Sequence, residues 1–276
     1  MKQLNMTFKK IILSLSLTIP LTLIGCKETK STAEAIPKEA PTMPWEDPSY
    51  ETNIRATQAE GRPPETWKLW EQHHENRKRS TSEKDIDLLM IGDSIVFRWS
   101  RNGKKVWDKF YGERNAANIG SSGDRTYHML WHIKNGGLEG MKDHNPKLVV
   151  MMIGTNNRGK PELHGEDTAY GILALLKEVH AQLPDSKILL MPIFPRGDTP
   201  EDAGRVRNNE INEIIHDFVD NKTVHWLDIN HIFLDKEGKL NRDLMPDGLH
   251  PGEKGYIAWA EAMEPTIKKF IGAKTP

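Results

Sequence analysis

Widely separated places in the chain carry the residue types that serine-dependent acyl transfer requires. Ser94 follows Gly92 and Asp93, and near the C-terminus Asp247 precedes His250 by three residues. A serine nucleophile needs a general base to take its proton and an acid to orient that base. His250 suits the first role and Asp247 the second. The sequence therefore predicts a catalytic triad of Ser94, His250 and Asp247.

The oxyanion that forms during acyl transfer also needs preorganised hydrogen-bond donors. The predicted donors are the backbone amides of Ser94 and Gly120 and the side-chain amide of Asn156. Glycine at position 120 lets the backbone approach a substrate closely. The plainer alternatives are an ordinary turn glycine at this position and a turn-capping role for Asn156.

Each part of the triad has a structural alternative as well. Asp93 or Ser94 would also cap a following helix, and a turn with a surface histidine often contains the pattern Asp-x-x-His. Asp228, at the end of a predicted strand, is a rival for the acid. We favour Asp247 because its three-residue spacing from His250 suits a single loop or turn.

Short apolar runs alternate with helical patterns along the chain, and these elements must position the polar residues. The predicted strands are Ile86–Ile91, Ala116–Ile119, Leu148–Ile153, Ile188–Ile193 and Val224–Ile229. The predicted helices are Gly103–Tyr111, Tyr127–Lys134, Thr168–Leu183, Ala203–Val219 and Glu253–Ile271. Nearly continuous apolar strands are typical of parallel sheets covered by helices on both faces. The sequence thus predicts an α/β fold with three α/β/α layers around a five-stranded parallel sheet.

Ligands of such folds bind at the carboxyl ends of the strands. Ser94, Gly120 and Asn156 each come just after the end of a predicted strand. Parallel strands end at one edge of a sheet, so we expect these three residues to gather there.

The same blocks resemble the SGNH (GDSL-like) hydrolase superfamily. They occur in the expected order between about Asp85 and Gly272, and they are Gly92-Asp93-Ser94-Ile95, Gly120, Gly154-Thr155-Asn156-Asn157 and Asp247-Gly248-Leu249-His250. The branch of platelet-activating-factor acetylhydrolase catalytic subunits is similar also at Asn118-Ile119-Gly120, Gly123-Asp124-Arg125-Thr126 and Pro195-Arg196-Gly197. The resemblance implies a flavodoxin-like SGNH fold and a serine carboxylic-ester hydrolase, an acetylesterase, that needs no metal or cofactor.

The N-terminal region has the pattern of an export signal. A basic start is followed by an apolar stretch from Ile11 to Gly25, shorter than the roughly 20 residues that a membrane span needs. Leu23-Ile24-Gly25-Cys26 resembles a bacterial lipoprotein cleavage box, and Cys26 is the only cysteine of the chain. The resemblance implies lipidation of Cys26 and an exported bacterial lipoprotein, anchored to a membrane on its periplasmic or cell-surface side.

The chain divides into four predicted segments. These are a lipoprotein signal peptide (1–25), a flexible, proline-containing tether (26–48), an N-terminal helical extension packed on the domain (49–84) and the SGNH hydrolase domain (85–276). The extension contains a predicted helix from Pro64 to about Lys78. Trp45 and Tyr50 are placed to dock the end of the tether onto the domain.

Weaker signals have two interpretations each. His128 and His132 have the i, i+4 spacing of a metal pair, but no third ligand is evident and packing is favoured. Three arginines at strand ends either line the pocket mouth or are structural: Arg98, Arg125 and Arg196. Three aromatic residues either stack on a sugar or, as we favour, pack in the core: Trp99, Tyr127 and Trp131.

Composition limits the partners of this chain. The formal net charge of −1 gives no whole-chain case for nucleic-acid binding. An exported, tethered esterase would meet acetylated carbohydrate, which we favour as the substrate. Two alternatives stay open at this point: hydrolysis of phospholipid or other lipid esters, and a catalytically silent lipoprotein that binds a glycan or a partner.

Overall fold

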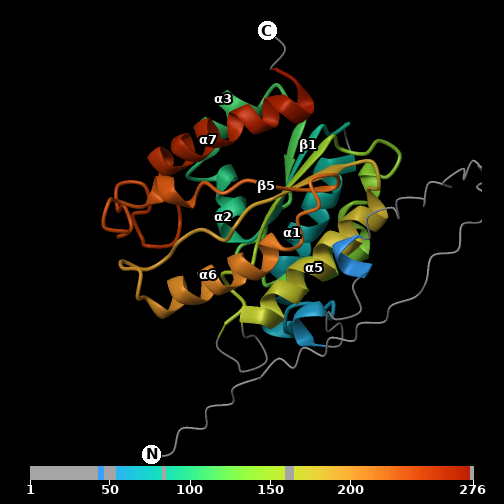
Figure 1. The fold of residues 1–276 in the computed structure, drawn as a ribbon. Coiled ribbons are helices and arrows are strands. Elements are labelled where there is room, and N and C mark those ends of the chain that lie inside the picture. The colour runs from blue at the N-terminus through green and yellow to red at the C-terminus, as the bar shows by residue number, and fades with distance from the viewer. Residues whose placement is uncertain (1–42, 47–53, 83–84, 159–164, 274–276) are drawn as a thin grey trace, which may run out of the picture. The chain divides into compact units, whose positions relative to one another are not determined.

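Five short strands form a single parallel sheet at the centre of the chain (Figure 1). In chain order they are β1 (Leu88–Gly92), β2 (Ala116–Asn118), β3 (Leu148–Met152), β4 (Lys187–Leu190) and β5 (Val224–Trp226). Their order across the sheet is β2-β1-β3-β4-β5, with every neighbouring pair parallel. This computed structural model describes residues 43–46, 54–82, 85–158 and 165–273. The predicted five-stranded α/β fold is confirmed.

Helices cover both faces of this sheet because alternate strand residues point to opposite sides. Leu89 and Ile91 of β1 belong to one buried cluster, and Leu88 and Met90 belong to the other. The first cluster packs beneath α4 (Thr126–His132), α5 (Gly165–Gln182) and α6 (Ala203–His216). The second packs beneath α2 (Ser94–Phe97), α3 (Lys104–Tyr111) and α7 (Glu253–Ile271). The result is a three-layer arrangement whose loops meet at the carboxyl edge of the sheet.

The register of the central strands brings two of the predicted site segments together. Gly92, the last residue of β1, lies beside Met152, the last residue of β3. The chain therefore leaves the sheet toward Ser94 and toward Asn156 at adjacent points.

Two predicted strands extend three residues further than the observed ones. The expected runs Ile188–Ile193 and Val224–Ile229 end at Leu190 in β4 and Trp226 in β5. Beyond β4, a side chain replaces the strand partner: Asn212 bonds the backbone N–H and C=O of Ile193, at 2.7 and 2.9 Å. Apolar composition alone does not show where such a replacement begins.

One predicted helix changes its geometry before it ends. The expected helix Tyr127–Lys134 is α4 up to His132 and then a wider π-helical turn, Ile133–Gly137. Asn135 and Gly136 depart from helical dihedrals there, and Gly136 has φ +87°. Short 3₁₀ helices complete the described structure at Pro44–Glu46, Arg55–Thr57, Arg98–Ser100, Glu139–Met141 and Asn230–Phe233.

The segment before the sheet packs on the domain through aromatic residues. Helix α1 (Pro64–Ser82) buries Trp70 and His74. At the end of the predicted tether, Trp45 packs against the first core cluster, with its ring centroid 5.2 Å from that of His180. The docking predicted for Trp45 is thus present, whereas Tyr50, the signal peptide and Cys26 lie outside the described residues. No helix among the described residues is long and apolar enough to cross a membrane.

A buried ion pair fastens α7 to the segment that leads into β2. Arg114 donates from both terminal nitrogens to the Glu264 carboxylate, at 3.1 and 2.7 Å. The Arg114 side chain is only 3% exposed. The guanidinium therefore depends on Glu264 for its charge partner.

We expect Glu264→Gln to lower the free energy of unfolding by about 3–5 kcal/mol, because it leaves a buried guanidinium without its carboxylate. Glu261→Gln is the control, since Glu261 is exposed on the same helix. Urea denaturation at neutral pH measures both. Equal stability of the two variants would show that the Arg114–Glu264 pair contributes little.

Candidate active site

Ser94 stands at the point where β1 turns into a helix. Asp93 caps that helix, because its carboxylate accepts a hydrogen bond from the amide of Ile95 at 2.9 Å. Ser94 is the first residue of α2, and its Oγ lies 2.9 Å from Nε2 of His250. Asp93 therefore caps the helix, and the hydroxyl of Ser94 is left to contact His250.

Asp247 holds the histidine from the other side. Its Oδ2 lies 2.7 Å from Nδ1 of His250, and its Oδ1 accepts the backbone amides of His250 and Leu249 at 2.7 and 3.0 Å. Gly248 between them has φ +77°, a conformation that favours glycine. Asp228 is exposed, and its carboxylate accepts the amide of Asn230. The structure thus joins Asp247 to His250 and places Asp228 elsewhere.

The environment keeps His250 neutral near neutral pH. Burial lowers its pKa below the ordinary 6.5, the Asp247 carboxylate opposes this, and the charges of Arg98 and Arg196 lower the pKa further. Burial raises the pKa of Asp247, but the hydrogen bonds from His250 and Leu249 hold it below the ordinary value. A neutral imidazole with a free base nitrogen next to a serine hydroxyl is the arrangement that general-base catalysis needs.

Two of the predicted oxyanion donors, Gly120 and Asn156, already make hydrogen bonds within the protein. The amide of Gly120 donates to Oδ1 of Asn118 at 2.8 Å, and Nδ2 of Asn156 donates to the carbonyl of Asp124 at 3.0 Å. A Cβ at position 120 would lie 2.5 Å from the amide nitrogen of Phe97, so only glycine fits there. The second N–H of Asn156 makes no hydrogen bond with the described residues. A bound oxyanion would use that N–H and share the amide hydrogen of Gly120 with Asn118.

The loop that carries Asn156 is braced by its neighbours. Arg125 donates from Nε to the carbonyl of Asn156 at 3.0 Å. Asn157 accepts the amide of Thr126 at 3.0 Å and donates to its hydroxyl at 2.7 Å. Arg125 is thus structural, one of the two interpretations considered for it.

A buried carboxylate, Asp124, ties α1 to this loop. It is fully buried and accepts hydrogen bonds from Arg62 at 2.8 Å and from the indole of Trp70 at 3.0 Å. Nε2 of His132 lies 3.1 Å from its other oxygen. Burial raises the pKa of Asp124, but His132 and Arg62 lower it more, so the carboxylate stays charged. Residue spacing could not predict this network, because Arg62 and Asp124 are 62 residues apart.

The histidine pair on α4 is part of this packing. Burial lowers the pKa of His128 and of His132 to about 4, so both are neutral at neutral pH. Nδ1 of His132 lies 2.9 Å from Nδ1 of His74. Within the described ranges, no group of three His, Cys, Asp or Glu residues is arranged to hold a metal ion. The packing interpretation therefore fits the pair.

The three aromatic residues considered for sugar stacking are not among the residues that line the cleft beside His250. Trp99 and Tyr127 are fully buried. Trp131 is half-buried and packs against Trp67 and Trp70 of α1, with ring centroids 5.1 and 4.8 Å apart. The core-packing interpretation fits all three.

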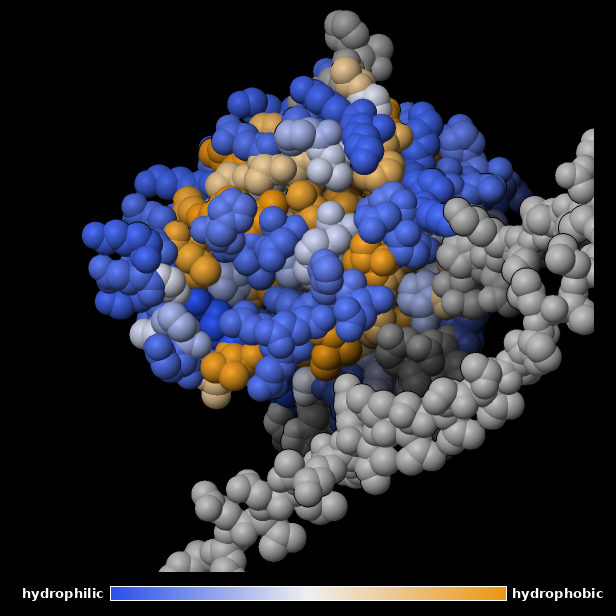
Figure 2. Space-filling view, viewed as in Figure 1, coloured by the Kyte–Doolittle hydropathy of each residue, from blue (hydrophilic) through white to orange (hydrophobic). Residues whose placement is uncertain are grey.

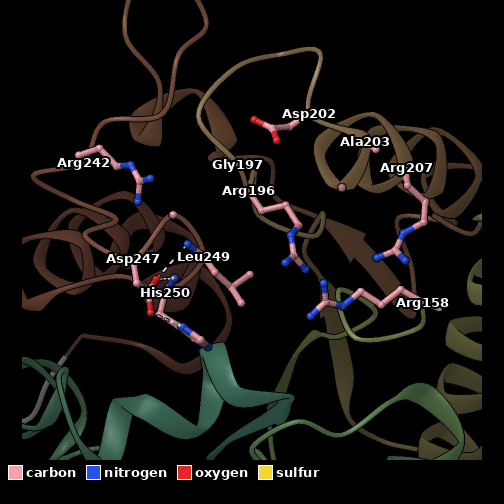
Figure 3. Close-up of a pocket in the computed structure, with 12 residues that line it drawn as sticks. Arg158, Arg196, Gly197, Asp202, Ala203, Arg207, Arg242, Asp247, Leu249 and His250 are labelled. Atoms are coloured by element: carbon pink, nitrogen blue, oxygen red, sulfur yellow. Dashed lines mark hydrogen bonds and ion pairs between the residues drawn. The ribbon is translucent and has the colours of Figure 1, made fainter.

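A polar cleft of about 630 Å³ opens beside His250 (Figure 3). Its lining consists of Arg158, Arg196, Gly197, Asp202, Ala203, Gly204, Arg207, Arg242, Asp247, Gly248, Leu249 and His250. Arg196 thus lines the pocket, whereas Arg98 lies beside the triad, 3.4 Å from Oδ2 of Asp247. The sequence analysis did not predict three further arginines of the lining: Arg158, Arg207 and Arg242. The position of Arg158 directly after the Asn156-Asn157 block was a usable signal.

Comparison with known proteins agrees with this architecture. The sequence profile of the GDSL-like Lipase/Acylhydrolase family matches residues 90–258. The chain belongs to this family. As a GDSL-like hydrolase, it has an esterase or acylhydrolase framework around the Ser94 site.

Individual relatives of this GDSL-like hydrolase are similar over most of their length. Platelet-activating factor acetylhydrolase IB subunit alpha1 of Homo sapiens is 28% identical over 224 residues, 81% of this chain and 90% of the relative. Subunit alpha2 of Rattus norvegicus is 30% identical over 203 residues, 73% and 85% of the two chains.

Solved structures share the fold. One described as a putative platelet activating factor from Streptococcus pneumonia has a TM-score of 0.59 at 21% identity, covering 74% of this chain and 95% of that one. An acetylxylan esterase from Geobacillus stearothermophilus has a TM-score of 0.50 at 18% identity, covering 70% and 97%.

The electrostatics of His250 predict the pH dependence of this GDSL-like hydrolase. The base must be neutral, and its pKa is lowered in the folded protein, so activity should persist below pH 6.5 and fail only as His250 gains a proton. We expect the acidic limb of kcat/KM for 4-nitrophenyl acetate to have its midpoint below 6.5. A midpoint above 6.5 would mean that the Asp247 charge outweighs burial.

Proposed function

We propose that the protein is a serine acetylesterase that works through an acyl-enzyme on Ser94. The observation that carries this proposal is the unbroken chain of hydrogen bonds from Ser94 Oγ through His250 to Asp247, with distances of 2.9 and 2.7 Å. Membership of a GDSL-like Lipase/Acylhydrolase family supports the reaction class. The acetyl preference is our inference from the acetylhydrolase and acetylesterase names of the relatives.

The first half of the reaction transfers the acyl group to the enzyme. His250 Nε2 accepts the hydroxyl proton of Ser94 while Oγ forms a bond to the ester carbonyl carbon. The carbonyl oxygen becomes an oxyanion, which the donors at Ser94, Gly120 and Asn156 stabilise. When the tetrahedral species collapses, the carbon–oxygen bond to the alcohol breaks and His250 returns its proton to the departing oxygen.

The second half releases the acid and restores the serine. His250 takes a proton from a water molecule, whose oxygen attacks the acyl carbon. Collapse of this second tetrahedral species breaks the bond to Oγ, and His250 returns the proton to Ser94. Asp247 keeps Nδ1 protonated and stabilises the transient imidazolium in both halves.

The favoured substrate is an acetylated carbohydrate. The cleft beside His250 is lined mainly by charged side chains and glycines, with only Ala203 and Leu249 apolar. Such a lining suits a hydroxylated sugar better than an acyl chain, which would need an extended apolar channel. A relative in the fold comparison is an acetylxylan esterase.

The second candidate is the hydrolysis of acetyl esters on phospholipids. The specific observation in its favour is the similarity to platelet-activating factor acetylhydrolase subunits over 73–81% of this chain. The third candidate is a lipoprotein that binds a glycan or a partner and has no activity. The hydrogen-bonded Ser94, His250 and Asp247 argue against it.

We expect the chain from residue 27 onward to release acetate from 4-nitrophenyl acetate and from acetylated oligosaccharides. Ser94→Ala should lose this release by at least about 1000-fold, because the nucleophile is gone. An enzymatic acetate assay on a panel that includes an acetylated phospholipid measures it. Release from the phospholipid alone would select the second candidate, and no Ser94-dependent release from folded protein would select the binding protein.

Asn156→Ala provides an internal check of the oxyanion assignment in the same assay. We expect kcat to fall about 100–1000-fold with little change in KM, because the hydrogen bond from the Asn156 side-chain amide to the substrate oxygen strengthens only in the transition state. Folding of each variant is compared by circular dichroism. An Asn156→Ala enzyme with nearly full turnover would remove Asn156 from the oxyanion hole.

We also propose that the protein is an exported lipoprotein, anchored to a membrane through acyl chains on Cys26. The support is the cleavage-box resemblance of Leu23-Ile24-Gly25-Cys26 in the sequence. Cys26→Ala in the full chain should abolish acyl labelling and release the protein from the membrane fraction, since its lipid supplies the anchor. Mass spectrometry of the mature N-terminal peptide checks this. An unmodified Cys26 in the exported protein would contradict it.

A further inference from the structure

One wall of the active-site cleft carries a concentration of positive charge. Arg158 follows β3, Arg196 follows β4 and Arg207 lies on α6, yet all three line the same cleft. In Figure 3 the guanidinium groups of Arg158 and Arg196 point toward each other, with Arg207 beside them, and His250 and Asp247 form the facing wall. We call Arg158, Arg196 and Arg207 the arginine wall.

No hydrogen bond between the arginine wall and the described residues pairs its charge with a carboxylate. Arg196 donates to the hydroxyl of Thr155 at 3.0 Å, and Arg207 donates to the carbonyls of Asn157 and Thr155 at 2.7 and 2.9 Å. These acceptors are neutral. Among the described residues, no carboxylate oxygen lies within 4.0 Å of a nitrogen of the wall.

Arg242, in the same cleft, shows the contrast. It lies on the side of Asp247 in Figure 3, and its Nε is 2.7 Å from the carboxylate of Asp198. Its charge is therefore paired. Asp202 also lines the cleft, but its carboxylate points away from the arginine wall in Figure 3.

The members of the wall act on one another electrostatically. Burial lowers the pKa of Arg196 and of Arg207, and the neighbouring arginines lower both pKa values further, while Asp202 and Asp93 raise that of Arg196 and Glu210 raises that of Arg207. Like charges held together without an anion repel, and a bound anion relieves that repulsion. Guanidinium groups bind carboxylates in a planar, paired geometry that suits this task.

The surroundings favour a sugar as the bearer of the anion. The surface over α6 and the adjacent C-terminal loops is largely hydrophilic in Figure 2. The cleft itself offers only Leu249 and Ala203 as apolar lining, too little to hold a lipid chain.

We propose that the arginine wall binds the carboxylate of an acidic sugar unit, so that the preferred substrate is an acetylated, uronic-acid-containing glycan. The inference rests on the proposed esterase function and adds the charge of the alcohol part of the ester. Arg158 is its main contact, because it is exposed and its side chain makes no hydrogen bond or ion pair with the described residues.

The test compares two substrates that differ only in charge. The first is an acetylated glucuronate oligosaccharide, and the second is its methyl ester, which keeps the shape and removes the negative charge. We expect wild-type kcat/KM for acetate release to be about tenfold higher or more with the free carboxylate, as one charge-assisted hydrogen bond provides. This preference should shrink as salt is raised, because the cleft is open to solvent.

Arg158→Gln should reduce the preference for the carboxylate about tenfold, mainly through KM. Arg79→Gln is the matched control, since it removes the same charge from an exposed position on α1 and should leave the preference unchanged. Calorimetric binding of the unacetylated glucuronate oligosaccharide to Ser94→Ala, with and without Arg158→Gln, gives a readout that does not depend on turnover.

The outcomes separate this inference from the proposed function. Equal rates with both substrates, with Ser94-dependent release intact, would overturn the arginine-wall inference and leave the esterase. No Ser94-dependent release, together with Arg158-dependent binding of the glucuronate, would overturn the esterase and keep the anion site. A preference for an acetylated anionic phospholipid over the acidic sugar would overturn the sugar assignment.

Discussion

The hydrogen bond between Ser94 and His250 depends on elements from both ends of the domain. It joins residues 156 positions apart at a distance of 2.9 Å. Ser94 is placed by the end of β1 and by the cap that Asp93 provides to α2. His250 is placed by the turn at Gly248, immediately before α7, which packs on the same face of the sheet as α2. The geometry of the candidate nucleophile therefore depends on the packing of α2 and α7 on one face of the sheet.

The loops at the carboxyl edge are held by polar contacts that the sheet itself does not supply. The carboxylate of the fully buried Asp124 accepts hydrogen bonds from Arg62 and Trp70 of the N-terminal extension. Its backbone carbonyl accepts a hydrogen bond from the side-chain amide of Asn156. An unpaired carboxylate in that position would be costly, so the extension contributes to the site as well as to packing. Arg125 braces the same loop from its other side. Preorganised donors of this kind are what oxyanion stabilisation requires.

The sequence was sufficient where local pattern determines structure. Apolar periodicity gave the five parallel strands, and the strand ends located Ser94, Gly120 and Asn156. It failed where a distant side chain decides the outcome. Beyond the end of β4, Asn212 rather than a strand partner bonds the backbone of Ile193, and Arg62 contacts Asp124 across 62 residues. The arginine wall was only partly visible, through Arg196, because its members come together by crossover connections between strands. Such contacts have no signature in residue spacing.

The positive charge around the triad connects catalysis to substrate choice. Burial lowers the pKa of His250, and Arg98 and Arg196 lower it further. This keeps the base neutral but also makes the imidazolium formed in the transition state harder to stabilise. A substrate carboxylate held against the arginine wall would offset the charge of Arg196 at the moment when His250 takes the serine proton. An acidic substrate would then help to stabilise the imidazolium together with Asp247, while a neutral substrate would leave that task to Asp247 alone. In the proposed complex, the carboxylate that the arginine wall recognises thus also stabilises the charge that develops on His250 during the reaction at Ser94.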